Sequence, residues 1–198
     1  MMIKTVCVFC GSSMGSNPVY ADKARNLAEY FLSKQITLVY GGANVGLMRV
    51  LADTMLTGGG KVIGVMPRSL VEREVAHVTL TEMHIVDGMQ ERKALMAELS
   101  DAFIALPGAY GTLDELFEML TWNQLGMIRK PVGLLNADGY FDQLVRMLDH
   151  AVEEKFLRPE HREILIVEED EAVLLEKLDQ FRPVTADKWI ERLKEGKI

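Results

Sequence analysis

Positive charges are scarce in this sequence relative to negative ones. The 198 residues include 22 Lys and Arg against 29 Asp and Glu, so the formal net charge is −7. Tight binding of a polyanion needs a basic stripe that displaces counterions, and the chain has none. The composition therefore argues against nucleic acid as the main partner. A small phosphate ligand would have to be held by local backbone N–H groups and one or two cations.

Cysteine is also scarce, since Cys7 and Cys10 are the only two. Their C-x-x-C spacing occurs in redox and zinc motifs. Here the run 6–9 is apolar and reads as a strand, on which residues three apart face opposite sides. We therefore predict two buried, unreactive thiols that point away from each other. Free thiols favour a reducing, cytoplasmic location.

Long apolar runs are missing as well. No stretch approaches the roughly 18 apolar residues that a membrane span requires. Residues 1–4 lead directly into a strand and have no apolar signal-peptide region or cleavage site. We therefore expect a cytoplasmic protein without a membrane partner.

Several catalytic signatures are absent. The four histidines show no H-E-x-x-H or related spacing, so no metal site is expected. No G-x-S-x-G elbow supports Ser–His–Asp hydrolysis, and no Walker G-K-[ST] follows a glycine-rich turn. No lysine stands in a recognisable pyridoxal-phosphate setting, so no cofactor is expected.

What the sequence does contain is a regular alternation of strands and amphipathic helices. Strands are expected at 3–10, 36–40, 61–66, 79–86, 101–106, 131–136 and 164–167, and helices at 17–34, 45–56, 88–99, 112–124, 140–156 and 169–181. Nearly continuous apolar strands that alternate with helices predict a parallel sheet covered on both faces. We interpret residues 1–198 as a single α/β domain, a doubly wound, Rossmann-like nucleotide-binding fold.

Ligands of such sheets bind beyond the carboxyl ends of the strands, so the loops at those ends are the candidate site. These loops are 11–16, 41–44, 67–77, 87–93 and 107–115. Gly41 and Gly42 are expected to permit close backbone approach, whereas Gly11-Ser12-Ser13 fits either a ligand cradle or a simple turn.

The segment 107–115 reads Pro-Gly-Ala-Tyr-Gly-Thr-Leu-Asp-Glu, follows a strand and opens a helix. Glycines and the free N–H groups of a helix start make an anion site suited to phosphate. Thr112 and Glu115 also have the spacing of a capping box. On the helical wheel, Glu115 points away from the apolar face. The spacing alone leaves open whether Glu115 is a cap or a catalytic carboxylate.

Arg92 is the second unusual residue. On the predicted helix 88–99 it falls in the middle of an apolar stripe that comprises Met89, Leu95, Met96 and Leu99, with Lys93 at the edge. A buried arginine requires an anionic or planar partner. That partner is either a structural carboxylate or a ligand in the cleft.

These two motifs together resemble a known family. Met89-Gln90-Glu91-Arg92-Lys93 and the segment 107–115 are similar to the M-x-x-R-K and P-G-G-x-G-T-x-x-E motifs of the Lonely Guy (LOG) family, the cytokinin riboside 5′-monophosphate phosphoribohydrolases. The resemblance extends over about residues 3–167. It implies hydrolysis of the N-glycosidic bond of a purine nucleoside 5′-monophosphate, which gives a free base and ribose 5-phosphate.

The resemblance also implies roles for individual residues. Arg92 and Glu115 match the catalytic positions of the family. Substrate contacts are expected at Ser13, Gly42, Glu74, Met89, Lys93, Gly108, Ala109, Tyr110, Gly111, Thr112, Leu113, Asp114 and Thr121. A homodimer is implied as well. The proton donor to the leaving base is not identified, although Glu74 and Asp87 are candidates, and plain AMP and N6-prenylated AMP remain open as substrates.

The chain departs from the family pattern at three positions. Ala109 replaces the second glycine of P-G-G, and would cost about 1–2 kcal/mol if that position needed a left-handed backbone. Ala43 and Arg49 replace glycines that usually follow the second strand. The alternative to an enzyme is a non-catalytic binder of similar fold, such as the molybdenum-cofactor carriers. Lysine decarboxylase, an old label for the family, has no support in these residues.

Overall fold

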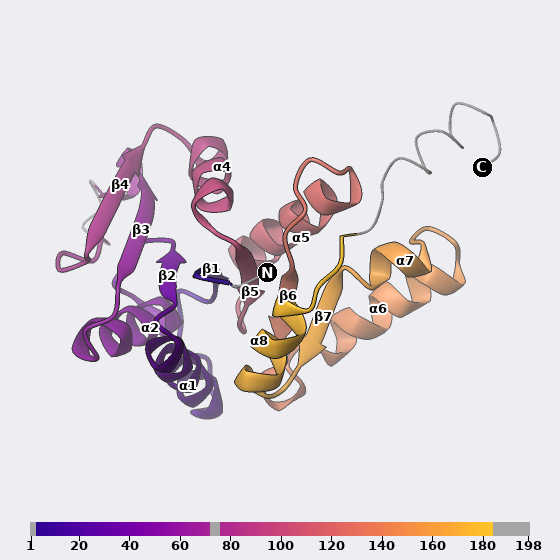
Figure 1. The fold of residues 1–198 in the computed structure, drawn as a ribbon, viewed down its shortest axis with the longest axis horizontal. Coiled ribbons are helices and arrows are strands. Elements are labelled where there is room, and N and C mark those ends of the chain that lie inside the picture. The colour runs from indigo at the N-terminus through magenta and orange to yellow at the C-terminus, as the bar shows by residue number, and fades with distance from the viewer. Residues whose placement is uncertain (1–2, 72–75, 184–198) are drawn as a thin grey trace.

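The centre of the molecule is a parallel sheet. The computed structural model describes residues 3–71 and 76–183. Within them, seven strands lie in the order β4-β3-β2-β1-β5-β6-β7, and all neighbours are parallel (Figure 1). The strands are β1 (Thr5–Phe9), β2 (Thr37–Tyr40), β3 (Val62–Pro67), β4 (Glu82–Val86), β5 (Ala102–Ala105), β6 (Val132–Leu135) and β7 (Leu165–Glu168).

Helices cover both faces of this sheet. They are α1 (Val19–Lys34), α2 (Gly46–Thr57), α3 (Arg68–Val71), α4 (Met89–Leu99), α5 (Tyr110–Gln124), the 3-10 turn η1 (Ala137–Gly139), α6 (Asp142–Glu153), α7 (Pro159–Arg162) and α8 (Glu171–Asp179). Apolar side chains of α1, α2 and α8 form one layer, and those of α4, α5 and α6 form the other. The predicted doubly wound α/β fold is therefore confirmed. None of the helices in the described residues is both long and apolar enough to cross a membrane.

Strand β1 shows how the sequence separates the two layers. Val6 and Val8 are buried in the layer with α1 and α2, whereas Cys7 and Phe9 are buried on the side of α4 and α5. Cys10 returns to the first layer, so the two thiols diverge as predicted. Burial raises the pKa of both thiols, which keeps them protonated and poorly nucleophilic.

The elements differ from the sequence prediction mainly at their ends. Helix α5 begins at Tyr110, two residues before the predicted start at 112. The segment 67–77, expected to be irregular, contains the single helical turn α3, and α7 was not predicted. One-turn helices are too short to show an apolar period, so sequence patterning cannot detect them.

The chain reverses its winding direction between β1 and β5, which are neighbours in the sheet although α1 and α5 leave them toward opposite faces. Beyond their carboxyl ends, the Gly11 N–H donates to the Pro107 carbonyl oxygen at 2.9 Å. A crevice of about 170 Å³ opens there, bordered by the loop after β1, the turn before α5, Tyr20 and Tyr140. Such a reversal point is where doubly wound sheets bind ligands.

Candidate active site

Arg92 and Glu115 form a buried ion pair near these strand ends. Nη1 of Arg92 donates to Oε1 of Glu115 at 2.7 Å, and the two side chains are only 11% and 10% exposed. Nε of Arg92 donates to the Val65 carbonyl oxygen of β3 at 3.0 Å. The guanidinium also lies against Gly41, where a Cβ atom would be 2.3 Å from Nη2. The expected close approach at Gly41 is therefore confirmed, and its cause is an arginine side chain.

The capping-box interpretation of Glu115 is wrong. Ala109 is the N-cap of α5, no side chain caps this end, and Thr112 lies inside the helix. The Glu115 carboxylate turns inward to Arg92, which also corrects the expectation that it points away from the buried face. A helical wheel considers one helix alone, so it cannot anticipate a buried partner from another helix.

The predicted stripe on α4 is corrected in a similar way. Lys93, Met96 and Ala97 are the buried residues of this helix, whereas Met89 is 45% exposed at its first turn. The helix is rotated so that Lys93, expected at the edge, is buried with only 7% exposure. The sequence left open whether Arg92 pairs with a structural carboxylate or with a ligand. In the structure its partner is a carboxylate, and that carboxylate belongs to Glu115, the other candidate catalytic residue.

Glu115 has an environment that shifts its acidity. Burial raises the pKa of its carboxyl group, and the charge and hydrogen bond of Arg92 oppose this effect. Asp114 raises the pKa further, whereas Lys93 lowers it. A desolvated carboxylate held by one arginine can stabilise a positive charge that develops beside it, or can orient and deprotonate a water molecule.

Lys93 is already occupied by two acidic side chains of α5. Its Nζ lies 3.0 Å from Oδ2 of Asp114 and 3.0 Å from Oε2 of Glu118. Burial alone would lower the pKa of Lys93, but these two partners outweigh burial and raise it. Lys93 is therefore a permanent cation. Glu118 was not singled out in the sequence, and its only signal was its place one turn after Asp114 and Glu115.

The turn before α5 is tightly packed and leads into a helix start that has no side-chain cap. A Cβ atom at Gly108 would lie 2.0 Å from Oγ1 of Thr112, so only glycine fits there. Ala109 has φ −110°, outside the left-handed region, so its substitution for glycine carries no backbone penalty. Because no side chain among the described residues caps α5, the first N–H groups, including those of Tyr110 and Gly111, are open to a ligand on the part of the chain that the structure describes.

A tyrosine that sequence reasoning missed supports this turn. The Tyr140 hydroxyl donates to the Gly108 carbonyl oxygen at 2.8 Å. The ring of Tyr140 meets Tyr20 edge to face, with centroids 5.6 Å apart, and both residues border the crevice. No local motif marks Tyr140, because it lies 32 residues after Gly108 in the sequence and reaches the turn only in the folded protein.

The other predicted substrate contacts and proton donors lie in several different loops and helix starts. Ser13 borders the crevice, and Gly42 has φ +79° and accepts a hydrogen bond from the His77 N–H at 2.8 Å. Leu113 and Asp114 lie in the first turns of α5, and the Asp114 side chain is 60% exposed. Glu74 lies outside the described residues. The other proton-donor candidate, Asp87, is exposed just before α4.

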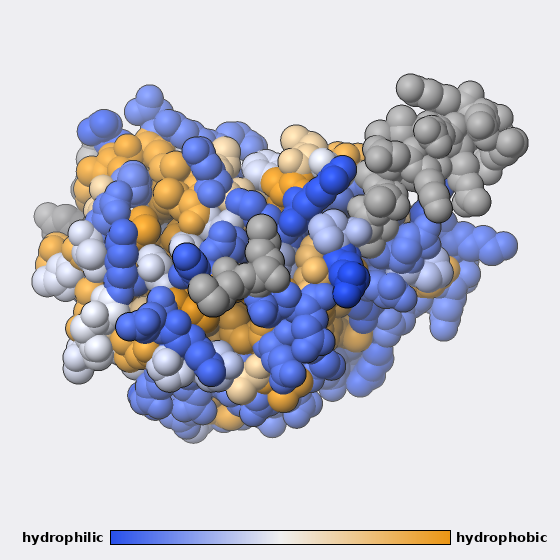
Figure 2. All heavy atoms as spheres, viewed as in Figure 1, coloured by the Kyte–Doolittle hydropathy of each residue, from blue (hydrophilic) through white to orange (hydrophobic). Residues whose placement is uncertain are grey.

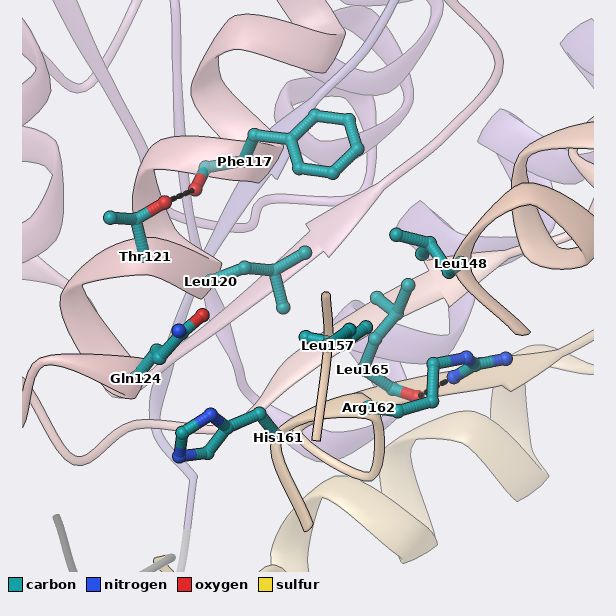
Figure 3. Close-up of a pocket in the computed structure, with 9 residues that line it drawn as sticks. All are labelled: Phe117, Leu120, Thr121, Gln124, Leu148, Leu157, His161, Arg162 and Leu165. Carbon is teal, nitrogen blue, oxygen red and sulfur yellow. Dashed lines mark hydrogen bonds between the residues drawn. The ribbon is translucent and has the colours of Figure 1, made fainter. Parts of the chain in front are cut away.

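Thr121 is not brought to the Arg92–Glu115 pair within one chain. It lies six residues after Glu115, about 9 Å further along the helix, and its hydroxyl donates to the Phe117 carbonyl oxygen at 2.7 Å. Thr121 borders a different pocket, shown in Figure 3. That pocket reaches Leu165 at the start of β7, and hence the opposite edge of the sheet.

A metal centre has no support in the part of the chain that the structure describes. No group of three or more His, Cys, Asp or Glu side chains is arranged there to hold an ion. The geometry instead combines one buried Arg–Glu pair, an uncapped helix start and a crevice at the reversal point of the sheet.

Comparison with known proteins agrees with the fold. The family model described as "Possible lysine decarboxylase" matches residues 48–178. A molybdenum cofactor binding protein from the phototrophic bacterium Rippkaea orientalis has a TM-score of 0.67 over 91% of this chain and 98% of its own. Its sequence identity is 20%, so this likeness concerns the fold alone.

Relatives of much higher identity come from plants. The probable cytokinin riboside 5′-monophosphate phosphoribohydrolase LOGL2 of Oryza sativa subsp. japonica is 46% identical over 98% of this chain and 87% of its own length. The cytokinin riboside 5′-monophosphate phosphoribohydrolase LOG5 of Arabidopsis thaliana is 46% identical over 91% of this chain and 79% of its own. The identity extends over almost the whole chain, and so the chain belongs to the Lonely Guy (LOG) family.

Proposed function

We propose that this protein hydrolyses the N-glycosidic bond of a purine nucleoside 5′-monophosphate and releases the free base and ribose 5-phosphate. The observation that carries the proposal is the buried Arg92–Glu115 pair, which lies close to the uncapped start of α5. The relatives that are named phosphoribohydrolases support the same reaction. The requirements of the reaction match what these groups supply.

Bond cleavage builds positive charge on the ribose ring. The electron pair of the C1′–N bond leaves with the base, a water oxygen bonds to C1′, and a proton passes to the base. The Glu115 carboxylate can stabilise the charged ring and orient the water. A guanidinium group does not give up its proton in proteins, so Arg92 is not the proton donor. Its role is to hold Glu115 and keep the carboxylate ionised.

The 5′-phosphate is proposed to bind at the turn before α5. The free N–H groups at the start of this helix and the positive end of its dipole suit a phosphate. Gly108 allows the backbone to pack closely against Thr112 there. Gly108, Ala109, Tyr110, Gly111 and Thr112 are the proposed phosphate contacts, with Leu113, Asp114, Ser13, Gly42, Met89 and Glu74 as proposed contacts to the rest of the nucleotide.

We further propose an N6-modified adenine nucleotide of the cytokinin type as the preferred substrate, because the plant relatives carry that substrate in their names. Plain AMP is the competing substrate. A prenyl group in an apolar pocket contributes only about 1–3 kcal/mol per methylene, so selectivity must be measured directly. Parallel incubation with AMP and isopentenyl-AMP, with the free base separated by chromatography, tests both the reaction and the preference.

A homodimer in the cytoplasm completes the proposal. Figure 2 shows hydrophobic residues gathered on the surface over β4 and α4, where Ile85 and Met89 are 47% and 45% exposed. A second copy that covered such a patch would remove it from water. The free thiols of Cys7 and Cys10 support a reducing compartment. Light scattering coupled to size-exclusion chromatography measures the mass of the assembly.

A non-catalytic carrier of the same fold is the alternative. Molybdenum-cofactor carriers share the architecture of this chain but are only 20% and 18% identical to it, whereas the two phosphoribohydrolases are each 46% identical to it. A carrier has no need of a desolvated Arg–Glu pair beside its anion site, so the pair favours an enzyme. Absence of base release from every nucleoside monophosphate would favour the carrier.

A further inference from the structure

Two consecutive residues of α4 form ion pairs with α5. Arg92 contacts Glu115, and Lys93 contacts Asp114 and Glu118. The helices themselves pack mainly on the sheet, α4 against β1, β2 and β3, and α5 against β1, β5 and β6. Both helices also contribute apolar side chains to the same core layer, and the ion pairs add a direct polar connection between them at the level of Glu115.

We propose that Lys93 is a positioning residue for the reaction: its ammonium group ties α4 to α5 through Asp114 and Glu118, and so holds the Glu115 carboxylate at Arg92. This inference rests on the proposed hydrolase function. It differs from the role that family resemblance implies for this position, which is a direct contact with the substrate.

Burial and geometry support the positioning role. The Lys93 side chain is 7% exposed, and its Nζ is 3.0 Å from each of its two acidic partners. Glu118 is itself only 18% exposed, so it depends on Lys93 for charge compensation. A substrate phosphate that approached Lys93 would meet the largely buried Glu118 carboxylate, which already neutralises the ammonium group. That approach is unfavourable, because the phosphate and Glu118 carry like charges.

Lys93 also affects Glu115 electrostatically. Among the described residues, the charged groups that act on Glu115 are Arg92 and Lys93 from α4 and Asp114 from its own helix. From β1, the buried thiols of Cys7 and Cys10 stay neutral, because burial raises their pKa. Loss of Lys93 would leave the Asp114 charge uncompensated, so the pKa of Glu115 would rise and less of it would be ionised at neutral pH.

The test compares two variants that separate positioning from folding. Lys93→Met alone leaves Glu118 as a buried anion without its cation and risks unfolding. The double variant Lys93→Met/Glu118→Gln removes the tie without leaving that anion. We expect kcat for the nucleotide to fall about 10- to 100-fold in the double variant while KM changes less than about 3-fold. We also expect the pKa of Glu115, followed by carbon-13 NMR of the carboxyl group without substrate, to rise.

Two further variants make the result specific. Glu118→Gln by itself should lower kcat partly, although Glu118 has no proposed substrate contact. Lys23→Met/Glu171→Gln is the matched control, since it removes a Lys–Glu pair of 3.2 Å between α1 and α8 on the other face of the sheet. That control should leave kcat, KM and the pKa of Glu115 unchanged, whatever its effect on the melting temperature.

Two results would overturn the proposal. A KM raised more than about 10-fold with kcat preserved in the double variant would make Lys93 a substrate contact. Unchanged kcat, KM and Glu115 pKa would make it a structural residue only. If the wild-type protein releases no base at all, the proposed function fails, whereas the NMR titration of Glu115 still decides the effect of Lys93.

Discussion

Gly41, directly after β2, leaves room for the guanidinium group of Arg92: a Cβ atom at this glycine would lie 2.3 Å from Nη2. The backbone of Gly41 is not left-handed, so an alanine here would conflict with the arginine side chain and would not strain the backbone. A glycine on one strand end therefore sets the position of a side chain from another element. The Arg92–Glu115 ion pair depends on this close approach.

Gly41→Ala should consequently displace Arg92 and disturb its pairing with Glu115. A misplacement of about 1 Å can cost 100-fold in rate, and we expect a loss of that order in kcat/KM. Gly88→Ala is the matched control, because a Cβ at Gly88 meets nothing within 4 Å. Steady-state kinetics of the two variants measures the difference, and equal activity would show that Arg92 need not stay where it lies.

Glu115→Gln should abolish base release while the protein stays folded. The amide oxygen can still accept a hydrogen bond from Arg92, but the negative charge that stabilises the ribose is lost. Removal of one such electrostatic group costs roughly 100- to 1000-fold in kcat. Chromatographic detection of the base, with circular dichroism as the folding control, measures both properties. Near-normal turnover would reduce Glu115 to a structural role.

Arg92→Ala should destabilise the protein in a way that depends on pH. The variant leaves a buried carboxylate without its cation, which costs about 3–5 kcal/mol for a buried pair. Burial raises the pKa of Glu115 and Arg92 opposes this, so the folded-state pKa rises further in the variant. The variant therefore loses the most stability at pH values above that raised pKa. The loss becomes smaller as the pH falls toward about 4.3, the ordinary pKa of a glutamate side chain.

Urea unfolding at several pH values measures this stability. Arg92→Ala/Glu115→Ala is the control, since it removes both charges. The deficit of this double variant relative to the wild-type protein should change much less between pH 4 and pH 8 than that of Arg92→Ala. A deficit that grows as the pH falls would contradict the assignment of Glu115 as the group that titrates.

The 5′-phosphate should be required for efficient hydrolysis. The uncapped start of α5 offers a phosphate several N–H donors, and a chain of net charge −7 has no general attraction for anions. We expect adenosine and isopentenyladenosine to be hydrolysed at least ~100-fold less efficiently than their monophosphates, about 2.7 kcal/mol of transition-state binding. Comparable kcat/KM for nucleoside and nucleotide would assign the turn to the fold alone.

Tyr140→Phe should weaken phosphate binding without removing it. The variant deletes the hydrogen bond to the Gly108 carbonyl oxygen but keeps the ring contact with Tyr20. A net loss of about 1 kcal/mol corresponds to a several-fold rise in KM for the nucleotide. The slow hydrolysis of adenosine is the internal control and should not change. A similar effect on both substrates would mean that Tyr140 acts on the whole site.

The sequence by itself determined the parts of this protein that depend on local patterning. Apolar runs and helical periods placed the strands and most helices, and alternation along β1 predicted the divergence of Cys7 and Cys10. The same patterning located the loops at the strand ends, where Gly41 and the turn before α5 lie. These features follow from neighbours a few residues apart, so the printed sequence is enough to read them.

Only the tertiary structure decided where Arg92, Lys93 and Glu115 lie and which partners they have. Arg92 and Glu115 are 23 residues apart in the chain, and they meet because α4 crosses from β4 at the sheet edge to β5 beside β1. The local sequence pattern indicated a capping role for Glu115 and placed Lys93 at the edge of the apolar stripe of its helix. Both assignments failed because the energy of a buried charge is set by the partner that the fold brings to it, and that partner lies on another helix.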